Sequence, residues 1–297
     1  KQRCLNQPYG DVGHLLRPLA YKVHPYQWPT IGKELSHIAN ATLDEVKDFF
    51  FRFYAPNNAV LAVTGNISFE ETVALTEKWF ASIPKRDVPV RQLPQEPAQT
   101  EERRLVVERN VPIDSLFMAY HMCERAHPDY YAFDILSDIL SNGKSSRLNR
   151  HLVQEKQLFS SIDAYISGTV DAGLFHISGK PAAGVSLEEA ETAVREELNR
   201  LQNEAVTVQE LEKVKNKFES TQIFGNINYL NVATNLAWFE LNGAAEDMEK
   251  EVERYRSVTA GQLQAVAQTS FDKRNGVVLY YKGLSPAVSV REGVKLD

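Results

Sequence analysis

The sequence predicts an α+β fold made of two related units, and three observations support this. Strand-like and helical segments are grouped rather than strictly alternating, which favours α+β over a doubly wound parallel sheet. One helix–turn–strand stretch occurs twice in the 297 residues. Four of the thirteen prolines fall between Pro84 and Pro97 among polar neighbours, a composition typical of an extended linker. We therefore expect one unit over residues 1–83, a linker over 84–100 and a second unit over 101–297.

In the first unit, a helix is predicted to begin at Thr42. Thr42 and Glu45 have the spacing of a capping box, and apolar residues follow at helical intervals. The turn sequence APNN at residues 55–58 ends this helix. Residues 59–63 (AVLAV) predict a buried strand that Gly65 terminates. A second helix is predicted from Ser68, which has Glu71 three residues later.

The second unit begins with two predicted strands, over residues 104–107 and 116–120. A helix over 130–140 and a second one through Leu148 and Leu152 follow, separated by the turn sequence SNGK. Strand patterns return at 159–167 and 173–178. The remaining predicted elements are helices near 187–201, 208–218, 229–241 and 248–255, a helix from Thr259 and a strand over 276–281.

The internal repeat aligns residues 41–68 with residues 258–285 without gaps. Thr42 aligns with Thr259, an offset of 217 residues, and Ser68 with Ser285 at the other end. Each copy contains a capping box, an amphipathic helix, a turn with Asn and an apolar strand. The same offset, applied to the start of the second unit, predicts that the first unit lacks its front half, about 115 residues before Lys1.

Composition excludes several classes of protein. The net charge of −6 provides no general attraction to nucleic acid. No apolar run approaches the ~20 residues that a membrane-spanning helix needs. The two cysteines, Cys4 and Cys123, are too few for a disulfide framework and are compatible with either cytoplasm or periplasm.

Several segments, in this order along the chain, resemble the insulinase/pitrilysin zinc metallopeptidases, in particular the bacterial branch related to processing peptidases. They are NQPYG at residues 6–10, HPYQWPTIG at 24–32, YAPNNAVLAVTGNI at 54–67 and GKSSRL at 143–148. The resemblance implies tandem homologous domains, the first of them truncated here. It also implies that the first domain carries an inverted zinc motif, H-x-x-E-H, and that the second is a catalytically empty copy that closes a substrate chamber.

The chain itself is predicted to hold no zinc site. Two histidine ligands on one helix face must lie three or four residues apart, and no two of the seven histidines do. The string HMCER at residues 121–125 follows a strand pattern and lacks the second histidine. The resemblance puts the motif positions of the second domain on Asp134, Ser137 and Asp138. Zinc is therefore expected in the full-length parent and not on this chain.

Four residues in the family-like segments are candidates for the wall of the substrate chamber: Tyr9, His24, Tyr26 and Trp28. Polar aromatic side chains can contact a peptide, although packing at the edge of the domain is the alternative role for each.

The functional hypothesis is that the parent is a zinc endopeptidase acting on peptides or unfolded segments. This chain would be inactive and would provide the second domain. The alternative is a naturally inactive family member that binds peptides as a processing partner. The expected partners are a peptide, the missing front of the first domain, and a family partner subunit or a second copy of the chain. No nucleic acid and no membrane span are expected, and the compartment is left open between bacterial cytoplasm and periplasm.

Overall fold

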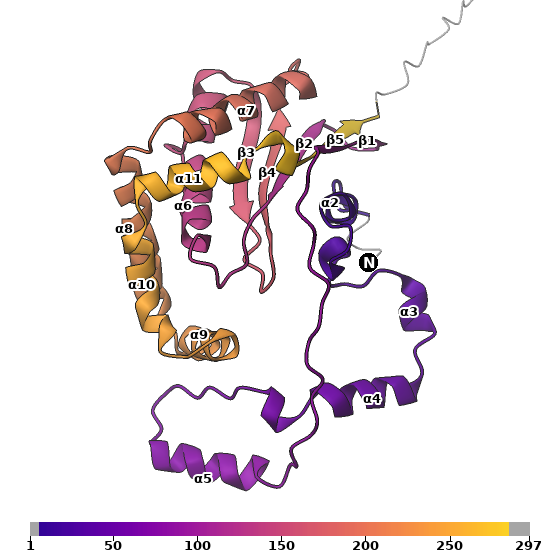
Figure 1. Ribbon diagram of the computed structural model, residues 1–297, viewed down its shortest axis with the longest axis vertical. Coiled ribbons are helices and arrows are strands. Elements are labelled where there is room, and N and C mark those ends of the chain that lie inside the picture. The colour runs from indigo at the N-terminus through magenta and orange to yellow at the C-terminus, as the bar shows by residue number, and fades with distance from the viewer. Residues whose placement is uncertain (1–5, 285–297) are drawn as a thin grey trace, which may run out of the picture.

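The computed structural model describes residues 6–284 (Figure 1). The aligned position Ser285 and the cysteine Cys4 lie outside this range. In the part of the chain that is described, no helix is both long and apolar enough to cross a membrane. The α+β class is confirmed, because one mixed sheet packs with helices on both of its faces.

The region before the linker contains helices and short turns but no strand among the described residues. Its elements are α2 (Val12–Ala20), η1 (Pro25–Gln27), α3 (Leu35–Ala39), α4 (Leu43–Phe53), η2 (Pro56–Asn58) and α5 (Phe69–Phe80). The sequence did not predict α2 and α3. The capping box at Thr42 is confirmed: its hydroxyl accepts from the Glu45 amide, and the Glu45 carboxylate accepts from the Thr42 amide.

The region after the linker contains the whole sheet and most of the helices. Its first elements are β1 (Arg103–Arg109), β2 (Ser115–His121), α6 (Tyr130–Ser141), the π-helical turn η3 (Asn149–Glu155), β3 (Phe159–Ile166) and β4 (Leu174–Pro181). The elements that follow are α7 (Leu187–Asn203), α8 (Val208–Gly225), α9 (Tyr229–Asn242), α10 (Asp247–Ser257), α11 (Ala260–Ser270), η4 (Lys273–Asn275) and β5 (Gly276–Gly283). Each predicted helix and strand of this region is confirmed, although α8 continues to Gly225, beyond the predicted end at residue 218.

The strand order is β1-β5-β2-β4-β3. Strand β5 pairs in parallel with β1 and antiparallel with β2, so the last described strand lies between the first two. The other neighbours, β2 with β4 and β4 with β3, are antiparallel.

Both faces of the sheet are buried along strand β5. Alternate β5 side chains show this: Val278 and Tyr280 join the main core under α6, α7 and α11, whereas Val277 and Leu279 pack with Leu16 and Ala20 of α2 on the other face. Helix α2 therefore belongs to the core of the second region although it precedes the linker (Figure 1).

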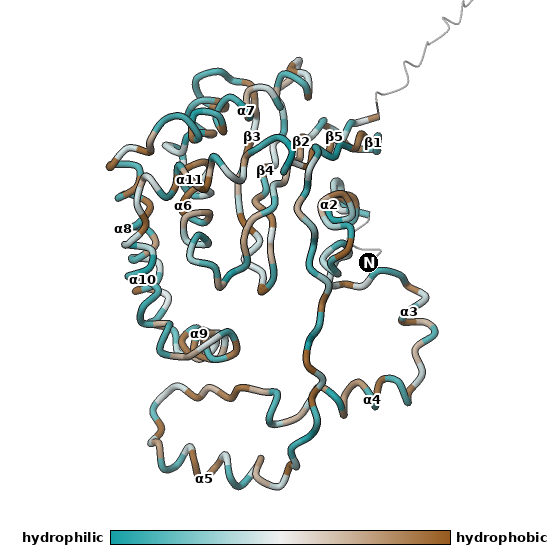
Figure 2. Tube along the Cα trace, in the orientation of Figure 1, coloured by the Kyte–Doolittle hydropathy of each residue, from teal (hydrophilic) through white to brown (hydrophobic). Residues whose placement is uncertain are grey.

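Helices α3, α4 and α5 extend away from this core (Figure 1). They expose large apolar side chains, among them Ile38, Phe49, Phe50 and Trp79, and Figure 2 shows the hydrophobic residues along these helices. The prediction of a strand over residues 59–63 is wrong, because the structure has no strand there. A strand needs a neighbouring strand for its N–H and C=O groups, and no described strand lies beside this segment.

The internal repeat is confirmed in local conformation. Both copies have an N-capped helix followed by a 3-10 turn, η2 or η4. In the first copy the Asn58 side-chain amide donates to the Phe53 carbonyl at 2.8 Å, and in the second copy Asn275 donates to the Ser270 carbonyl at 2.8 Å. The two bonds occupy aligned positions, so the two copies adopt the same turn.

The linker is extended, and side chains attach it to the rest of the chain. Arg86 donates to carbonyls at the end of α4, and Arg91 pairs with Asp171 in the β3–β4 loop. Further along, the Gln99 side-chain amide donates to the carbonyls of Arg274 and Gly276.

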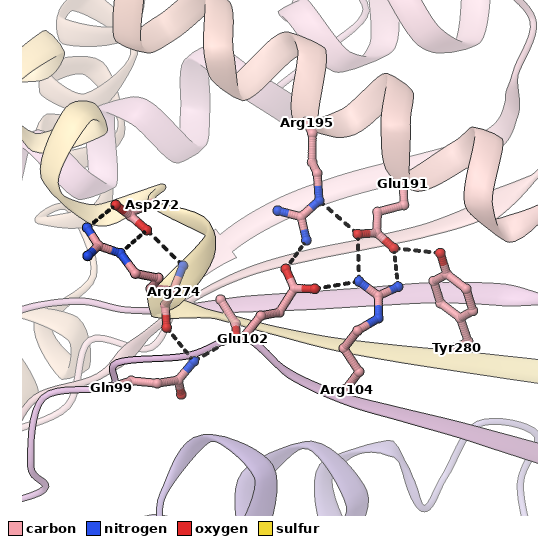
Figure 3. A network of polar contacts seen from close by, with 9 residues as sticks. Gln99, Glu102, Arg104, Glu191, Arg195, Asp272, Arg274 and Tyr280 are labelled. Atoms are coloured by element: carbon pink, nitrogen blue, oxygen red, sulfur yellow. Dashed lines mark hydrogen bonds and ion pairs between the residues drawn. The ribbon is translucent and has the colours of Figure 1, made fainter.

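A network of charges holds α7 against the edge of the sheet (Figure 3). The Glu191 carboxylate on α7 accepts hydrogen bonds from both terminal guanidinium nitrogens of Arg104, at 2.9 and 2.6 Å. It also accepts hydrogen bonds from the Tyr280 hydroxyl at 2.5 Å and from Arg195 at 2.8 Å. Arg195 also donates to Glu102. Burial alone would raise the pKa of Glu191, but these donors lower it to about 2.

Candidate functional site

The three zinc-motif positions of the second region lie on α6, and each polar group there already has a partner. The Asp134 side chain is half-buried, and its carboxylate accepts a hydrogen bond from the Tyr255 hydroxyl at 2.5 Å. Desolvation raises the pKa of this carboxyl, although that hydrogen bond opposes the rise. The Ser137 hydroxyl donates to the Asp134 carbonyl at 2.8 Å. The Asp138 carboxylate accepts a hydrogen bond from the Asn142 side-chain amide at 2.6 Å. These hydrogen bonds connect α6 to α10 and close the last turn of α6.

Zinc does not fit this set of residues. Zn²⁺ binds three or four nitrogen, sulfur or carboxylate ligands that are free to coordinate. Asp134 faces a tyrosine hydroxyl in the core, the aligned positions hold no histidine, and among residues 6–284 no group of three or more His, Cys, Asp or Glu side chains could hold a metal ion.

Two of the four chamber candidates, His24 and Tyr26, lie together. Their ring centroids are 4.3 Å apart, and His24 Nδ1 accepts the Tyr26 amide at 3.2 Å. His24 is buried, with Nε2 3.5 Å from an Asp171 carboxylate oxygen. Tyr21 packs against both rings and donates its hydroxyl hydrogen to the Ala172 carbonyl.

Glu96 from the linker fixes the backbone that carries His24. Its carboxylate accepts the amides of Lys22, Val23 and His24 at 2.7, 2.8 and 2.9 Å. Burial alone would raise the pKa of Glu96, but these three donors lower it. Glu96, His24 and Asp171 line a cleft of about 420 Å³.

The other two candidates, Tyr9 and Trp28, have different partners. Tyr9 has a positive φ of 62°, donates its hydroxyl hydrogen to the Ile113 carbonyl at 2.6 Å and packs against Tyr281 on the outer face of the sheet. Trp28 lies under the Lys33 ammonium, 5.4 Å from its ring centroid. The structure thus brings the rings of His24 and Tyr26 together, whereas among the described residues neither Tyr9 nor Trp28 makes a ring contact with them.

A second cleft, of about 660 Å³, lies between the loop before α6 and helices α9, α10 and α11. Arg125 follows β2 and lines this cleft, with its guanidinium 4.1 Å from the Tyr130 ring centroid and 5.1 Å from the Trp238 ring centroid. Sequence reasoning missed this site. Arg125 and Trp238 are 113 positions apart, and no local pattern indicates that they meet.

The fold defines an α+β domain of the peptidase-like type, with Asp134, Ser137 and Asp138 at the aligned positions of α6. The chain belongs to the peptidase M16 family: residues 40–218 match the model of the peptidase M16 inactive domain. This confirms the resemblance inferred from the NQPYG and HPYQWPTIG segments. The matched range starts before the linker and continues past it.

Individual proteins agree with the family match. The zinc protease PqqE of Helicobacter pylori is 31% identical over 216 residues, which is 72% of this chain and 48% of that protein. An uncharacterized zinc protease of Bacillus subtilis, YmxG, is 26% identical over 71% of this chain and 50% of its own length. The crystal structure of a protease from Helicobacter pylori superposes with a TM-score of 0.86 at 26% identity, covering 95% of this chain and 68% of the other. The chain thus spans about half the length of the curated relatives it matches.

Proposed function

We propose that this chain supplies the non-catalytic second domain, and the back half of the first, of a zinc-dependent endopeptidase that cleaves peptides or unfolded segments. The observation that carries the proposal is the set of residues on α6 at the positions aligned with the zinc motif. The zinc-motif positions of α6 hold Asp134, Ser137 and Asp138, whose polar groups are already hydrogen-bonded to Tyr255 of α10 or within α6 and its C-cap. In this proposal the zinc lies on a part of the parent outside residues 1–297.

The exposed apolar faces of α3, α4 and α5 support the division into domains. In the second copy of the repeat, α11 packs on α6 and α7, and β5 lies between two strands. The first copy has the same sequence pattern but no such neighbours among the described residues. We propose that a segment with the fold of residues 101–257 covers this face and receives residues 59–63 as a central strand.

The chamber between the two domains would bind the peptide. His24 and Tyr26 are proposed to shape its wall through their contacts with Tyr21 and Asp171, because His24 itself is buried. Their role remains a prediction, as do those of Tyr9 and Trp28.

The experiment compares the chain alone with the chain co-expressed with the polypeptide encoded upstream of it. We expect no bound zinc and no hydrolysis of a quenched-fluorescence peptide by the chain alone. The assembly should bind one zinc per molecule and hydrolyse the peptide. As the matched control, replacing the glutamate of the upstream H-x-x-E-H with glutamine should abolish hydrolysis and leave assembly intact.

Two results would contradict the proposal. One tightly bound zinc on the chain alone would contradict the proposal that the zinc lies outside residues 1–297. Gln, Tyr or Ser at the upstream motif positions, with no hydrolysis by the assembly, would favour the alternative of an inactive partner subunit. The apolar face of α3–α5 would then be the surface that meets an active companion.

A further inference from the structure

We propose that the cleft between α9, α10 and the loop before α6 binds the C-terminal end of a peptide whose last residue is large and apolar. Arg254 would pair with the terminal carboxylate, and the last side chain would lie against Trp238. This inference goes beyond the proposed function, because binding here needs neither zinc nor any part of the parent outside this chain.

The size and lining of the cleft suit such a ligand. Its volume of about 660 Å³ is within the ~300–1,000 Å³ range of ligand pockets. Apolar side chains dominate the wall and can bury an aromatic or branched side chain. They are Ala126, Pro128, Tyr131, Val170, Trp238, Phe239, Leu241 and Val258.

Arg125 forms a rigid, positively charged part of the wall. Its guanidinium is held by the rings of Tyr130, Tyr131 and Trp238 and by an ion pair with Glu251. Glu251 is not among the residues that line the cleft. A guanidinium that is stacked and paired in this way loses little further entropy when an anion approaches.

Arg254 is the group that can exchange partners. Its side chain is partly exposed, and it pairs with Asp247 at 2.9 Å and donates to the Tyr131 hydroxyl at 3.3 Å. Pairs this accessible to water contribute little to stability, so another carboxylate can replace Asp247 at small cost. Arg125 is already paired with Glu251, so the anion preference of the cleft rests on Arg254, which can exchange Asp247 for the carboxylate of a ligand.

The remainder of the peptide has a route out of the cleft. Val170 in the β3–β4 loop is half exposed and lines both this cleft and the smaller one beside His24. An extended chain that leaves the α9–α10 cleft past Val170 would therefore follow a surface that is already hollowed.

The test measures binding to the full chain through the fluorescence of Trp238, with Trp28→Phe and Trp79→Phe removing the other two tryptophans. The probe is N-acetyl-Leu-Phe with a free carboxylate. It should bind saturably and at least tenfold more tightly than its C-terminal amide or N-acetyl-Leu-Ser. 3-Phenylpropanoate, which has the ring and the carboxylate without peptide bonds, should bind at least threefold more weakly than the peptide.

Three variants test the assignment of residues. Arg254→Gln should weaken binding of the free acid at least tenfold, whereas Asp247→Asn should strengthen it about threefold because it removes the competing carboxylate. Arg256→Gln is the matched control: it removes an arginine from the same helix that pairs with Glu212 and Glu219 outside the cleft. It should leave the affinity unchanged.

Equal binding of acid and amide would overturn the proposal, as would an Arg256→Gln effect as large as that of Arg254→Gln. Equal binding of 3-phenylpropanoate and the peptide would overturn the peptide assignment. If Arg254→Gln proves unstable, Val170→Asp places a carboxylate at an exposed position of the lining and should weaken the free acid at least tenfold. Unchanged affinity in that variant would also count against the site.

Discussion

The two copies of the repeat have the same local structure and opposite environments. Leu263 on α11 is fully buried, whereas Val46, its aligned residue on α4, is 56% exposed. In the strand half of the repeat, Val278 is 1% exposed and its counterpart Leu61 is 58% exposed. Both helices nevertheless start at a capping threonine and end in a 3-10 turn closed by an asparagine. Local sequence is therefore sufficient for the helix and the turn, but burial and strand pairing require neighbours.

The largest expected difference between the copies is in core packing. Leu263→Ala should lower the free energy of unfolding by about 2–5 kcal/mol, because it leaves a cavity among buried side chains. Val46→Ala, at the aligned position, should change it by less than about 0.5 kcal/mol in this chain. Urea unfolding followed by circular dichroism measures both. Equal losses would mean that α4 is buried in solution and would break the comparison.

A smaller effect is expected from the charge network of the second region. The pKa of Glu191 is about 2 in the folded chain against an ordinary 4.5, so its contribution is complete above pH 4.5 and is lost as the pH falls towards 2. Glu191→Gln should cost on the order of 2–3 kcal/mol at pH 7 and flatten the acid dependence of stability between these values.

Glu188→Gln is the matched control, because Glu188 lies on the exposed side of the same helix. It should leave the acid dependence unchanged. A full acid dependence that persists in Glu191→Gln would show that other carboxylates control acid unfolding of the second region.

The smallest of the three effects concerns the turn asparagines. Asn275 donates to the Ser270 carbonyl and also to the His121 carbonyl at 3.0 Å, whereas Asn58 donates to the Phe53 carbonyl alone among the described residues. Asn275→Ala should therefore cost about 1–2 kcal/mol, and Asn58→Ala less than about 0.5 kcal/mol. The comparison would be sharpened if the cost of Asn58→Ala rose to that of Asn275→Ala once the upstream polypeptide was added. Such a rise would show that the first copy of the repeat had become packed against that polypeptide.

The sequence predicted the second region well because its signals are local. Capping residues marked the starts of α7, α8 and α11, and short apolar, strand-like segments marked the strands. The same signals over residues 59–63 predicted a strand that this chain does not form, because strand formation depends on a neighbour that the local pattern cannot reveal. Helix α2 was missed for a related reason: it is short, and its burial comes from the β5 face far along the chain.

The candidate sites divide in the same way. The family-like segment around His24 could be recognised from consecutive residues, but Asp171 and Glu96, which hold that histidine in place, come from distant segments. Arg125 and Trp238 meet only through the tertiary fold. Sequence patterns thus identified His24 as a member of its cluster, but no member of the cluster around Arg125 and Trp238.

The position of β5 has a consequence for synthesis on the ribosome. Strand β1 pairs with β5 among the described strands, and β5 is the last of these strands to leave the exit tunnel. Until residues 276–283 emerge, β1 has no partner and β2 keeps one edge open, so the sheet closes only when nearly the whole chain has been made. Contacts this distant in sequence are slow to form. The nascent second region would therefore expose two unpaired strand edges for most of its translation, and a chaperone that protects strand edges should associate with it during that interval.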